Sequence, residues 1–210
     1  MGSPRRAASG VQVRANVEAE LNRLFRGKLD DPLASEIVWL LDHYSALVAH
    51  QKTVDHELLT AAADNEICRR FMEIPGVGPM CALAFFTTVS EPHRFRRSSD
   101  IGAYLGLTPK LYQSGLTSRM GRISKMGNAA TRAVLVQAAM SLMRHGDPDS
   151  DLWTWASHIE QRRGRNRAKV ALARKLAVVM TAMWKSGQRY DPRRLQSSAA
   201  QEGEIGPRMA

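Results

Sequence analysis

Between residues 33 and 58, apolar side chains recur at alternating steps of four and three, which is the period of one face of an α-helix. The positions on this face are Leu33, Ile37, Leu40, Tyr44, Leu47, Gln51, Val54 and Leu58. Asp31 followed by Pro32 is typical of a helix start. So narrow an apolar face is buried only when another helix covers it. We favour a coiled coil with a second copy of the chain, in which Gln51 fixes the register; packing against the chain's own domain is the alternative.

The rest of the chain also has the helical period, and no alternation of strands and helices occurs. Asn128 and Gly146 are expected to bound one helix, and Gly187 to end the last one. The polar stretch 108–127 fits only a loop or a small hairpin. We therefore predict a mostly α-helical fold. Its parts are a disordered tail (1–10), a helical arm with a coiled-coil segment (11–63), a compact helical domain containing a helix-hairpin-helix (64–190) and a second disordered tail (191–210).

Composition narrows the class of protein further. The longest apolar stretch is far too short to span a bilayer, and the first residues do not resemble an export signal, so we expect no membrane association. Cys68 and Cys81 are the only cysteines, which favours buried thiols in a reducing compartment such as the cytoplasm. The histidines have no spacing typical of metal ligands, so we predict no metal site and no cofactor in this chain.

The net charge is +10, and the excess is concentrated in two segments. In the first, only Asp100 opposes Arg94, Arg96, Arg97, Lys110, Arg119, Arg122, Lys125 and Arg132. The second comprises Arg162, Arg163, Arg165, Arg167, Lys169, Arg174 and Lys175. A solvated surface usually mixes acids among its bases, so this pattern favours a nucleic acid as partner. For the second segment, simple solvation of a helix surface is an equal alternative.

A turn rich in glycine and proline at residues 74–79 separates two apolar helices. Gly76 and Gly78 match the helix-hairpin-helix pattern, in which backbone N–H groups face a phosphate. Arg96 and Arg97 would extend that contact. The alternative is a helix corner in which the glycines only permit close packing.

The stretch 104–128 combines hydroxyls, glycines and cations ahead of a helix, a composition suited to holding phosphates. We expect nucleic-acid contacts from its cations Lys110, Arg119, Arg122 and Lys125. Attack of a serine on a phosphodiester needs cations around the phosphate and a group that accepts the hydroxyl proton. The stretch supplies no such group, so the residues by themselves favour Ser114 as a turn residue.

At these residues the chain resembles the bacterial insertion-sequence transposases of the insertion sequence one-hundred-ten type. The matching motifs are Ile74-Pro75-Gly76-Val77-Gly78, Phe95-Arg96, Tyr104-Leu105-Gly106-Leu107-Thr108-Pro109, Ser114-Gly115, Gly121-Arg122-Ile123-Ser124-Lys125-Met126-Gly127-Asn128 and Ala171-x-Ala173-x-Lys175-Leu176-Ala177. In this order and spacing they are specific. The resemblance implies that residues 64–190 are a C-terminal transposase domain, that Ser114 is the nucleophile that links to cleaved DNA, and that the nearby cations hold phosphates. Ser124 is the fallback nucleophile.

The resemblance also implies partners and one gap. Family members bind element ends and target DNA, use a structured guide RNA, and carry an N-terminal RuvC-like nuclease domain with an acidic metal site. No such domain precedes the helical arm in this sequence. We therefore expect a truncated transposase that is inactive alone, with Mg²⁺ implied only for the nuclease domain. A non-catalytic nucleic-acid-binding remnant or regulator, and a helical scaffold with an incidental basic surface, are the alternatives.

Overall fold

The structure is a computed structural model that describes residues 16–17, 19–20, 23, 32–114 and 117–193. It divides into two compact units, Met1–Glu57 and Leu58–Ala210, and each is described by itself. The described residues are mostly helical, as the sequence predicts. The first expected tail, residues 194–210 of the second and the helix start at Asp31 lie outside the described residues.

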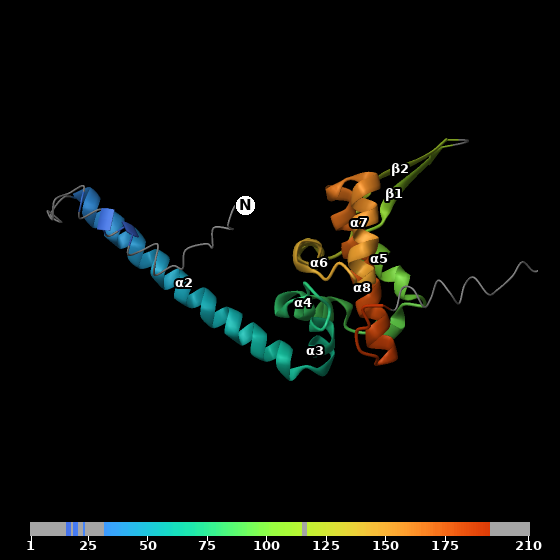
Figure 1. Cartoon of the computed structure of the whole chain (residues 1–210), viewed down its shortest axis with the longest axis horizontal. Helices are drawn as coiled ribbons and strands as arrows, with labels where there is room; N and C mark the ends of the chain where they lie inside the picture. The colour runs from blue at the N-terminus through green and yellow to red at the C-terminus, as the bar shows by residue number, and fades with distance from the viewer. Residues whose placement is uncertain (1–15, 18, 21–22, 24–31, 115–116, 194–210) are drawn as a thin grey trace, which may run out of the picture. The chain divides into compact units, whose positions relative to one another are not determined.

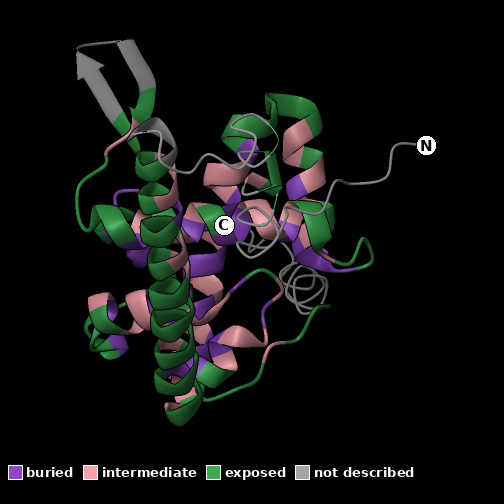
Figure 2. Cartoon of the chain, turned by 90° about the vertical axis from the view of Figure 1, so that its left-hand side faces the viewer, coloured by how far each residue is buried: buried purple, intermediate pink, exposed green. Residues whose placement is uncertain are grey.

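The first unit contains most of α2, which runs without interruption from Pro32 to Asp64. Leu40, Tyr44 and Leu47 are 58%, 41% and 63% exposed, and Figure 2 colours most of this helix as exposed. Leu40, Tyr44 and Leu47 of the predicted apolar face are therefore exposed on one uninterrupted helix, whereas Ile37 and Leu58 are half-buried. Whether a second copy covers that face stays a prediction.

The second unit is built around α8 (Arg165–Ser186). Helices α6 (Ala129–His145) and α7 (Asp151–Arg163) pack against α8, as do the short α3 (Glu66–Met72) and α5 (Ile101–Tyr104) (Figure 1). Helix α4 (Pro79–Val89) lies between α3 and α6. The 3₁₀ turns η1 (Pro92–Arg94) and η2 (Ser98–Asp100) also contact α8.

Aromatic and aliphatic side chains fill the centre of this unit. Phe71 is fully buried, with ring centroids 5.5 Å from Phe85 and 5.8 Å from Trp184. Trp184 also stacks on Phe86 at 5.0 Å. Such aromatic pairs add about 0.5–1.5 kcal/mol each beyond their buried area. Trp184 is therefore part of the core of this unit.

Helix boundaries follow local signals. The Asn128 side chain accepts a hydrogen bond from the Thr131 N–H at 3.1 Å and so begins α6. Gly187 ends α8 in the left-handed region, with φ of +67°. Asn65 begins α3 by accepting from the N–H groups of Ile67 and Cys68 at 3.0 and 3.1 Å. The boundaries predicted at Asn128, Gly146 and Gly187 are confirmed.

The polar stretch after α5 forms a two-stranded antiparallel hairpin of β1 (Pro109–Ser114) and β2 (Thr117–Ile123). Pro109 pairs with Ile123 at its base and Ser114 with Thr117 at its far end, with an irregularity between Pro109 and Leu111. None of the described helices is long and apolar enough to cross a membrane.

Candidate nucleic-acid interface

The base of the hairpin is a junction in which residues 104–108 and 124–127 meet backbone to backbone. Gly106 and Gly127 both have positive φ, +67° and +87°. A Cβ on Gly106 would lie 2.1 Å from the Met126 carbonyl oxygen, and one on Gly127 would lie 2.2 Å from that of Tyr104. Any side chain at either position would collide with backbone, so both positions require glycine.

Two backbone hydrogen bonds hold this junction together. The N–H of Lys125 donates to the Gly106 carbonyl at 3.1 Å, and the N–H of Ser124 donates to the Thr108 carbonyl at 2.8 Å. The two motifs that stand about twenty residues apart in the sequence are therefore one structural element, which we call the hairpin base.

Arg132 on α6 ties the hairpin base to the helical core. Its Nη1 donates to the Leu105 carbonyl at 3.1 Å and lies 3.3–3.4 Å from the carbonyls of Met126, Gly127 and Asn128. The side chain is half-buried. Its guanidinium is thus engaged with carbonyl oxygens, although the sequence groups Arg132 with the cations available to a polyanion.

Three of the predicted phosphate contacts lie at the hairpin base with exposed side chains, Lys110, Arg122 and Lys125. Lys125 has φ of +56°, a region that non-glycine residues rarely adopt. Its backbone is held there by its hydrogen bond to Gly106. The junction therefore fixes the backbone from which this cation projects.

Ser114 and Arg119 lie farther out along the hairpin. Arg119 pairs with Tyr112 in the register, and Ser114 pairs with Thr117. Their side chains lie outside the described part of the structure. Because a strand rises about 3.3 Å per residue, the Ser114 backbone lies roughly 16 Å along β1 from Pro109. Ser124, the fallback nucleophile, is at the base itself and half-buried.

The two glycines of the turn between α3 and α4 have different surroundings. Gly76 has φ of +85°, and a Cβ there would lie 2.6 Å from the Ala138 carbonyl oxygen and 2.8 Å from the Leu142 nitrogen of α6. Gly76 therefore permits close packing, which is the structural alternative for this motif. Gly78 begins α4, and no atom lies within 4 Å of a Cβ built on it. A phosphate contact at this turn stays a prediction.

Arg96 and Arg97 are exposed between η1 and η2. Arg97 donates its backbone N–H to the Asp100 carboxylate at 3.0 Å. The neighbouring Arg94 lies over the Tyr104 ring at 4.5 Å, a cation–π contact beside the hairpin base. Within the described residues, no hydrogen bond or ion pair joins Arg96 or Arg97 to the hairpin base.

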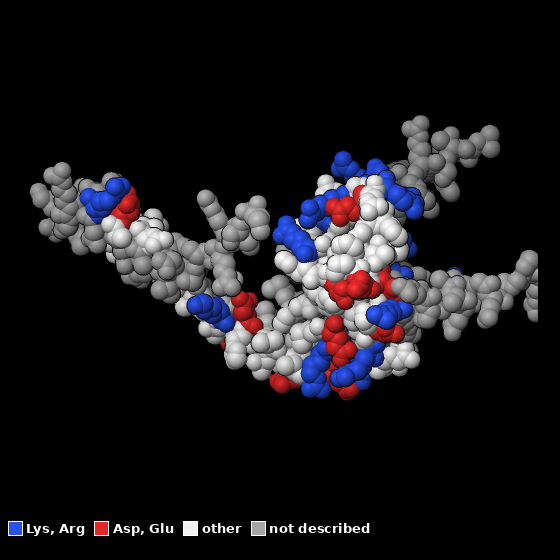
Figure 3. All heavy atoms as spheres, viewed as in Figure 1, with Lys and Arg blue, Asp and Glu red and all other residues white. Residues whose placement is uncertain are grey.

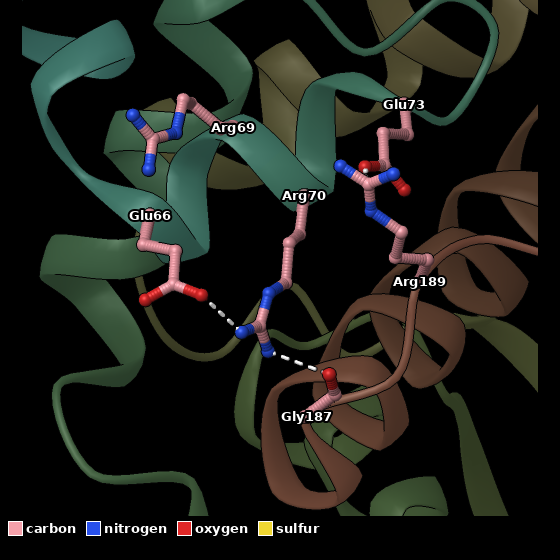
Figure 4. Close-up of a pocket in the computed structure, with 6 residues that line it drawn as sticks. All are labelled: Glu66, Arg69, Arg70, Glu73, Gly187 and Arg189. Carbon is pink, nitrogen blue, oxygen red and sulfur yellow. Dashed lines mark hydrogen bonds and ion pairs between the residues drawn. The ribbon is translucent and has the colours of Figure 1, made fainter.

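A cavity of about 250 Å³ lies between α3 and the end of α8, and sequence reasoning did not find it. Its lining residues are Glu66, Arg69, Arg70, Glu73, Gly187 and Arg189 (Figure 4). Arg70 bonds to Glu66 and to the Gly187 carbonyl, and Arg189 forms an ion pair with Glu73 at 3.1 Å. The contact of Arg70 with Gly187 and the pair of Arg189 with Glu73 therefore link α3 to the end of α8.

Burial determines the chemistry of the two thiols. It raises the pKa of Cys68 to about 11 and that of Cys81 to about 12. Both side chains are buried, which agrees with the core thiols expected from the sequence. Among the described residues, no group of three or more His, Cys, Asp or Glu side chains is placed to hold a metal ion.

Residues 68–154, from α3 to the start of α7, match the sequence model of the Transposase IS116/IS110/IS902 family. The chain is 35% identical over 170 residues to the transposase for insertion sequence element IS1111A of Coxiella burnetii, covering 75% of this chain and 47% of the relative. It is 31% identical over 193 residues to the putative transposase y4pF/y4sB of Sinorhizobium fredii, covering 88% and 48%. The transposase for insertion sequence element IS1328 of Yersinia enterocolitica is 34% identical over 139 residues, covering 66% and 42%.

The chain belongs, through this segment, to the IS116/IS110/IS902 transposase family. It spans about half the length of the curated relatives it matches. The matched segment contains the whole hairpin base, which is the part of the fold that presents Lys110, Arg122 and Lys125.

Proposed function

We propose that the second unit binds the DNA of an insertion sequence during transposition, as the C-terminal transposase domain of its family. The observation that carries this proposal is the coincidence of the family match, residues 68–154, with a rigid junction bearing exposed cations. Such a role puts the protein in the bacterial cytoplasm, in contact with the nucleoid.

The hairpin base contributes through position and charge. Lys110, Arg122 and Lys125 contact phosphates of the DNA backbone and release condensed counterions, so the affinity is strongly salt-dependent. The interlocked backbone holds these side chains near their binding positions, which lowers the entropy cost of binding. These contacts set the position of the DNA and carry no sequence information by themselves. Sequence choice then falls to a structured guide RNA, which we propose as a second partner.

We further propose that Ser114 is the nucleophile in this reaction. Its Oγ forms a bond to a backbone phosphorus, the bond from that phosphorus to one sugar oxygen breaks, and the hydroxyl proton passes to a base outside this hairpin. Mg²⁺ held by a nuclease domain would stabilise the charge that develops on the phosphate. The described residues of this chain include no acidic cluster for it.

A filter or anisotropy assay on the full chain tests the binding proposal. Replacing Arg122 and Lys125 together by Gln should lower affinity for labelled duplex DNA and reduce the slope of log K against log salt by about 0.9 for each phosphate that is no longer neutralised. The matched control replaces Lys52 on α2 and Arg69 on α3, two exposed cations that are not part of the hairpin base, by Gln. An equal fall in affinity in both double variants would contradict a specific role for the hairpin base.

A second assay tests the nucleophile. Element-end DNA, guide RNA, Mg²⁺ and a separately supplied nuclease domain of the family are mixed with the full chain, and protein–DNA adducts are separated under denaturing conditions. Ser114→Ala should abolish the adduct, whereas Ser124→Ala should retain it. The reverse result would move the nucleophile to the hairpin base.

A non-catalytic nucleic-acid-binding module is the second candidate function. The separation of roughly 16 Å along β1 between the Ser114 backbone and the base of the hairpin favours it, because Ser114 is then at the other end of the strand from the base. In that case Ser114→Ala leaves DNA binding unchanged and no adduct forms in any variant.

We also propose that the exposed apolar face of α2 pairs with a second copy of the chain. Light scattering coupled to size exclusion tests this. Leu47→Lys should convert a dimer to a monomer, whereas Lys52→Gln on the same helix should not. A monomeric wild-type chain would refute the proposal.

A further inference from the structure

A single residue, Gly164, links α7 to α8. It ends α7, donating its N–H to the Glu160 carbonyl at 2.8 Å, and it begins α8, accepting from the Ala168 N–H at 3.1 Å. Its φ of +80° and ψ of 158° lie in a region that only glycine adopts readily. No atom lies within 4 Å of a Cβ built there, so backbone conformation alone requires the glycine.

This tight link brings two short basic runs together. Arg162 and Arg163 end α7, and Arg165 and Arg167 lie in the first turn of α8. All four are exposed, as is every residue from Gln161 to Arg167. We call these four arginines the α7–α8 corner. Figure 3 shows Lys and Arg side chains gathered at the end of the compact unit that carries α7.

The described fold does not use this charge. Glu160 is the only acid between residues 160 and 169, and it lies 3.9 Å from Arg165. No ion pair is described for Arg162, Arg163 or Arg167. The buried residues of the two helices lie elsewhere, at Leu152 and Ala156 in α7 and from Ala168 onward in α8. Four like charges at one corner repel one another, and a polyanion would relieve that repulsion.

The absence of aromatic residues at the corner indicates which polyanion fits. Residues 160–169 contain none. The tryptophans nearest in the sequence, Trp153 and Trp155, pack against the core, and Lys175 lies 5.9 Å from the Trp155 ring. Single-stranded nucleic acids are bound largely by stacking unpaired bases on aromatic side chains. A duplex contacted through its phosphates needs only cations.

We propose that the α7–α8 corner is a second surface for the phosphate backbone of duplex DNA. It lies outside the segment matched by the family, residues 68–154. The inference extends the proposed function, because it adds a contact to the same partner, but it does not depend on the hairpin base.

The test measures binding of the full chain to a labelled DNA duplex of arbitrary sequence over a range of salt concentrations. Arg163 and Arg167 are both replaced by Gln. We expect the affinity to fall about tenfold or more at about 0.1 M salt and the log–log slope to decrease by about two. Replacing the same two residues by Lys keeps the charge and should restore the slope.

Two further variants separate this inference from the proposed function. The control pair Lys52→Gln and Arg69→Gln removes the same charge elsewhere and should leave the slope unchanged. The hairpin-base pair Arg122→Gln and Lys125→Gln tests the other surface. A weaker affinity only in the hairpin-base pair overturns the inference and keeps the proposed function. A weaker affinity only in the Arg163 and Arg167 pair supports the inference and contradicts the DNA contact proposed for the hairpin base.

Two outcomes would overturn the inference outright. One is an equal fall in affinity in the control pair, which would mean that net charge alone governs binding. The other is a slope that changes for double-stranded RNA or single strands but not for duplex DNA. Unfolding curves of each variant show whether it is folded; if the Gln pair is not, Arg162→Gln with Arg163→Gln provides the same measurement on α7 alone.

Discussion

The hairpin base and the α7–α8 corner are both basic segments that contain or adjoin a glycine, but each position requires glycine for a different reason. At the hairpin base, a Cβ on Gly106 would lie 2.1 Å from a backbone oxygen. At the corner, a Cβ on Gly164 would meet nothing within 4 Å. The first glycine is required by contact with a distant segment, and the second by its own backbone angles.

The cations of the two regions differ in the same way. Arg132 beside the hairpin base donates to carbonyl oxygens and holds two segments together. Arg163 and Arg167 at the corner are exposed, and no ion pair is described for either. An arginine in a basic segment is thus either engaged in contacts within the fold or left open to a partner, depending on whether carbonyl groups face it.

The largest expected effect comes from Gly106→Ala. The new methyl group collides with the Met126 carbonyl, and φ is positive, so we expect the free energy of unfolding to fall by about 3 kcal/mol or more. Urea denaturation measures it. Gly78→Ala is the matched control, with φ of −93° and open space, and should cost less than about 1 kcal/mol. Equal destabilisation by the two changes would contradict the conclusion that crowding makes glycine necessary at position 106.

Arg132→Ala should have the next largest effect. Its removal leaves the Leu105 carbonyl without the guanidinium donor, at a cost of about 1–3 kcal/mol in the free energy of unfolding. Hydrogen exchange at the Ser124 and Lys125 amides should accelerate. Arg144→Ala, an exposed arginine on the same helix, is the control and should change neither quantity by much. Unchanged exchange in Arg132→Ala would show that the hairpin base holds without it.

Gly164→Ala tests the second glycine, which its backbone angles alone require. Only backbone strain opposes the change, so we expect the free energy of unfolding to fall by about 1–2 kcal/mol. Urea denaturation beside Gly106→Ala gives the ratio of the two effects. If Gly164→Ala costs more than Gly106→Ala, crowding is not what distinguishes the two sites.

The smallest effect is a pH dependence from the core. Burial raises the pKa of Cys81 from 9.0 to about 12, so the folded state holds a proton that the unfolded state loses first. The stabilisation from this thiol is complete well below pH 9, starts to fall as pH approaches 9 and is lost as pH rises toward 12. Between about pH 8 and 9 we expect this thiol to lower the free energy of unfolding by about 0.4 kcal/mol. Cys68 titrates from the same ordinary value and contributes a similar fall, so Cys81→Ala should remove about half of the dependence. A profile unchanged in Cys81→Ala would assign the dependence to another group.

Much of the fold was predictable because its signals are local. The helical period, the Asn128 cap and the glycines that end α6 and α8 each act within a few residues of their position. A hairpin in the polar stretch was one of the two forms that the sequence allowed.

The candidate site was predictable only as a list of cations. The sequence selects Lys110, Arg122 and Lys125, which the structure gathers at the hairpin base, and it also groups Arg132 with them. The sequence does not indicate that Gly106 faces Met126. Nor does it indicate that the Glu73 carboxylate accepts a hydrogen bond from the N–H of Tyr190, 117 residues later. Those contacts join segments far apart in the chain, so no local pattern encodes them.

The sequence by itself determined the helices, their ends, the excess of positive charge and the family, because propensity, capping and motif spacing are properties of neighbouring residues. Only the tertiary structure decided which glycines are crowded and which cations remain open to a partner. The physical reason is that crowding and hydrogen bonding depend on which backbone lies within a few ångströms, and that is settled when distant segments pack together.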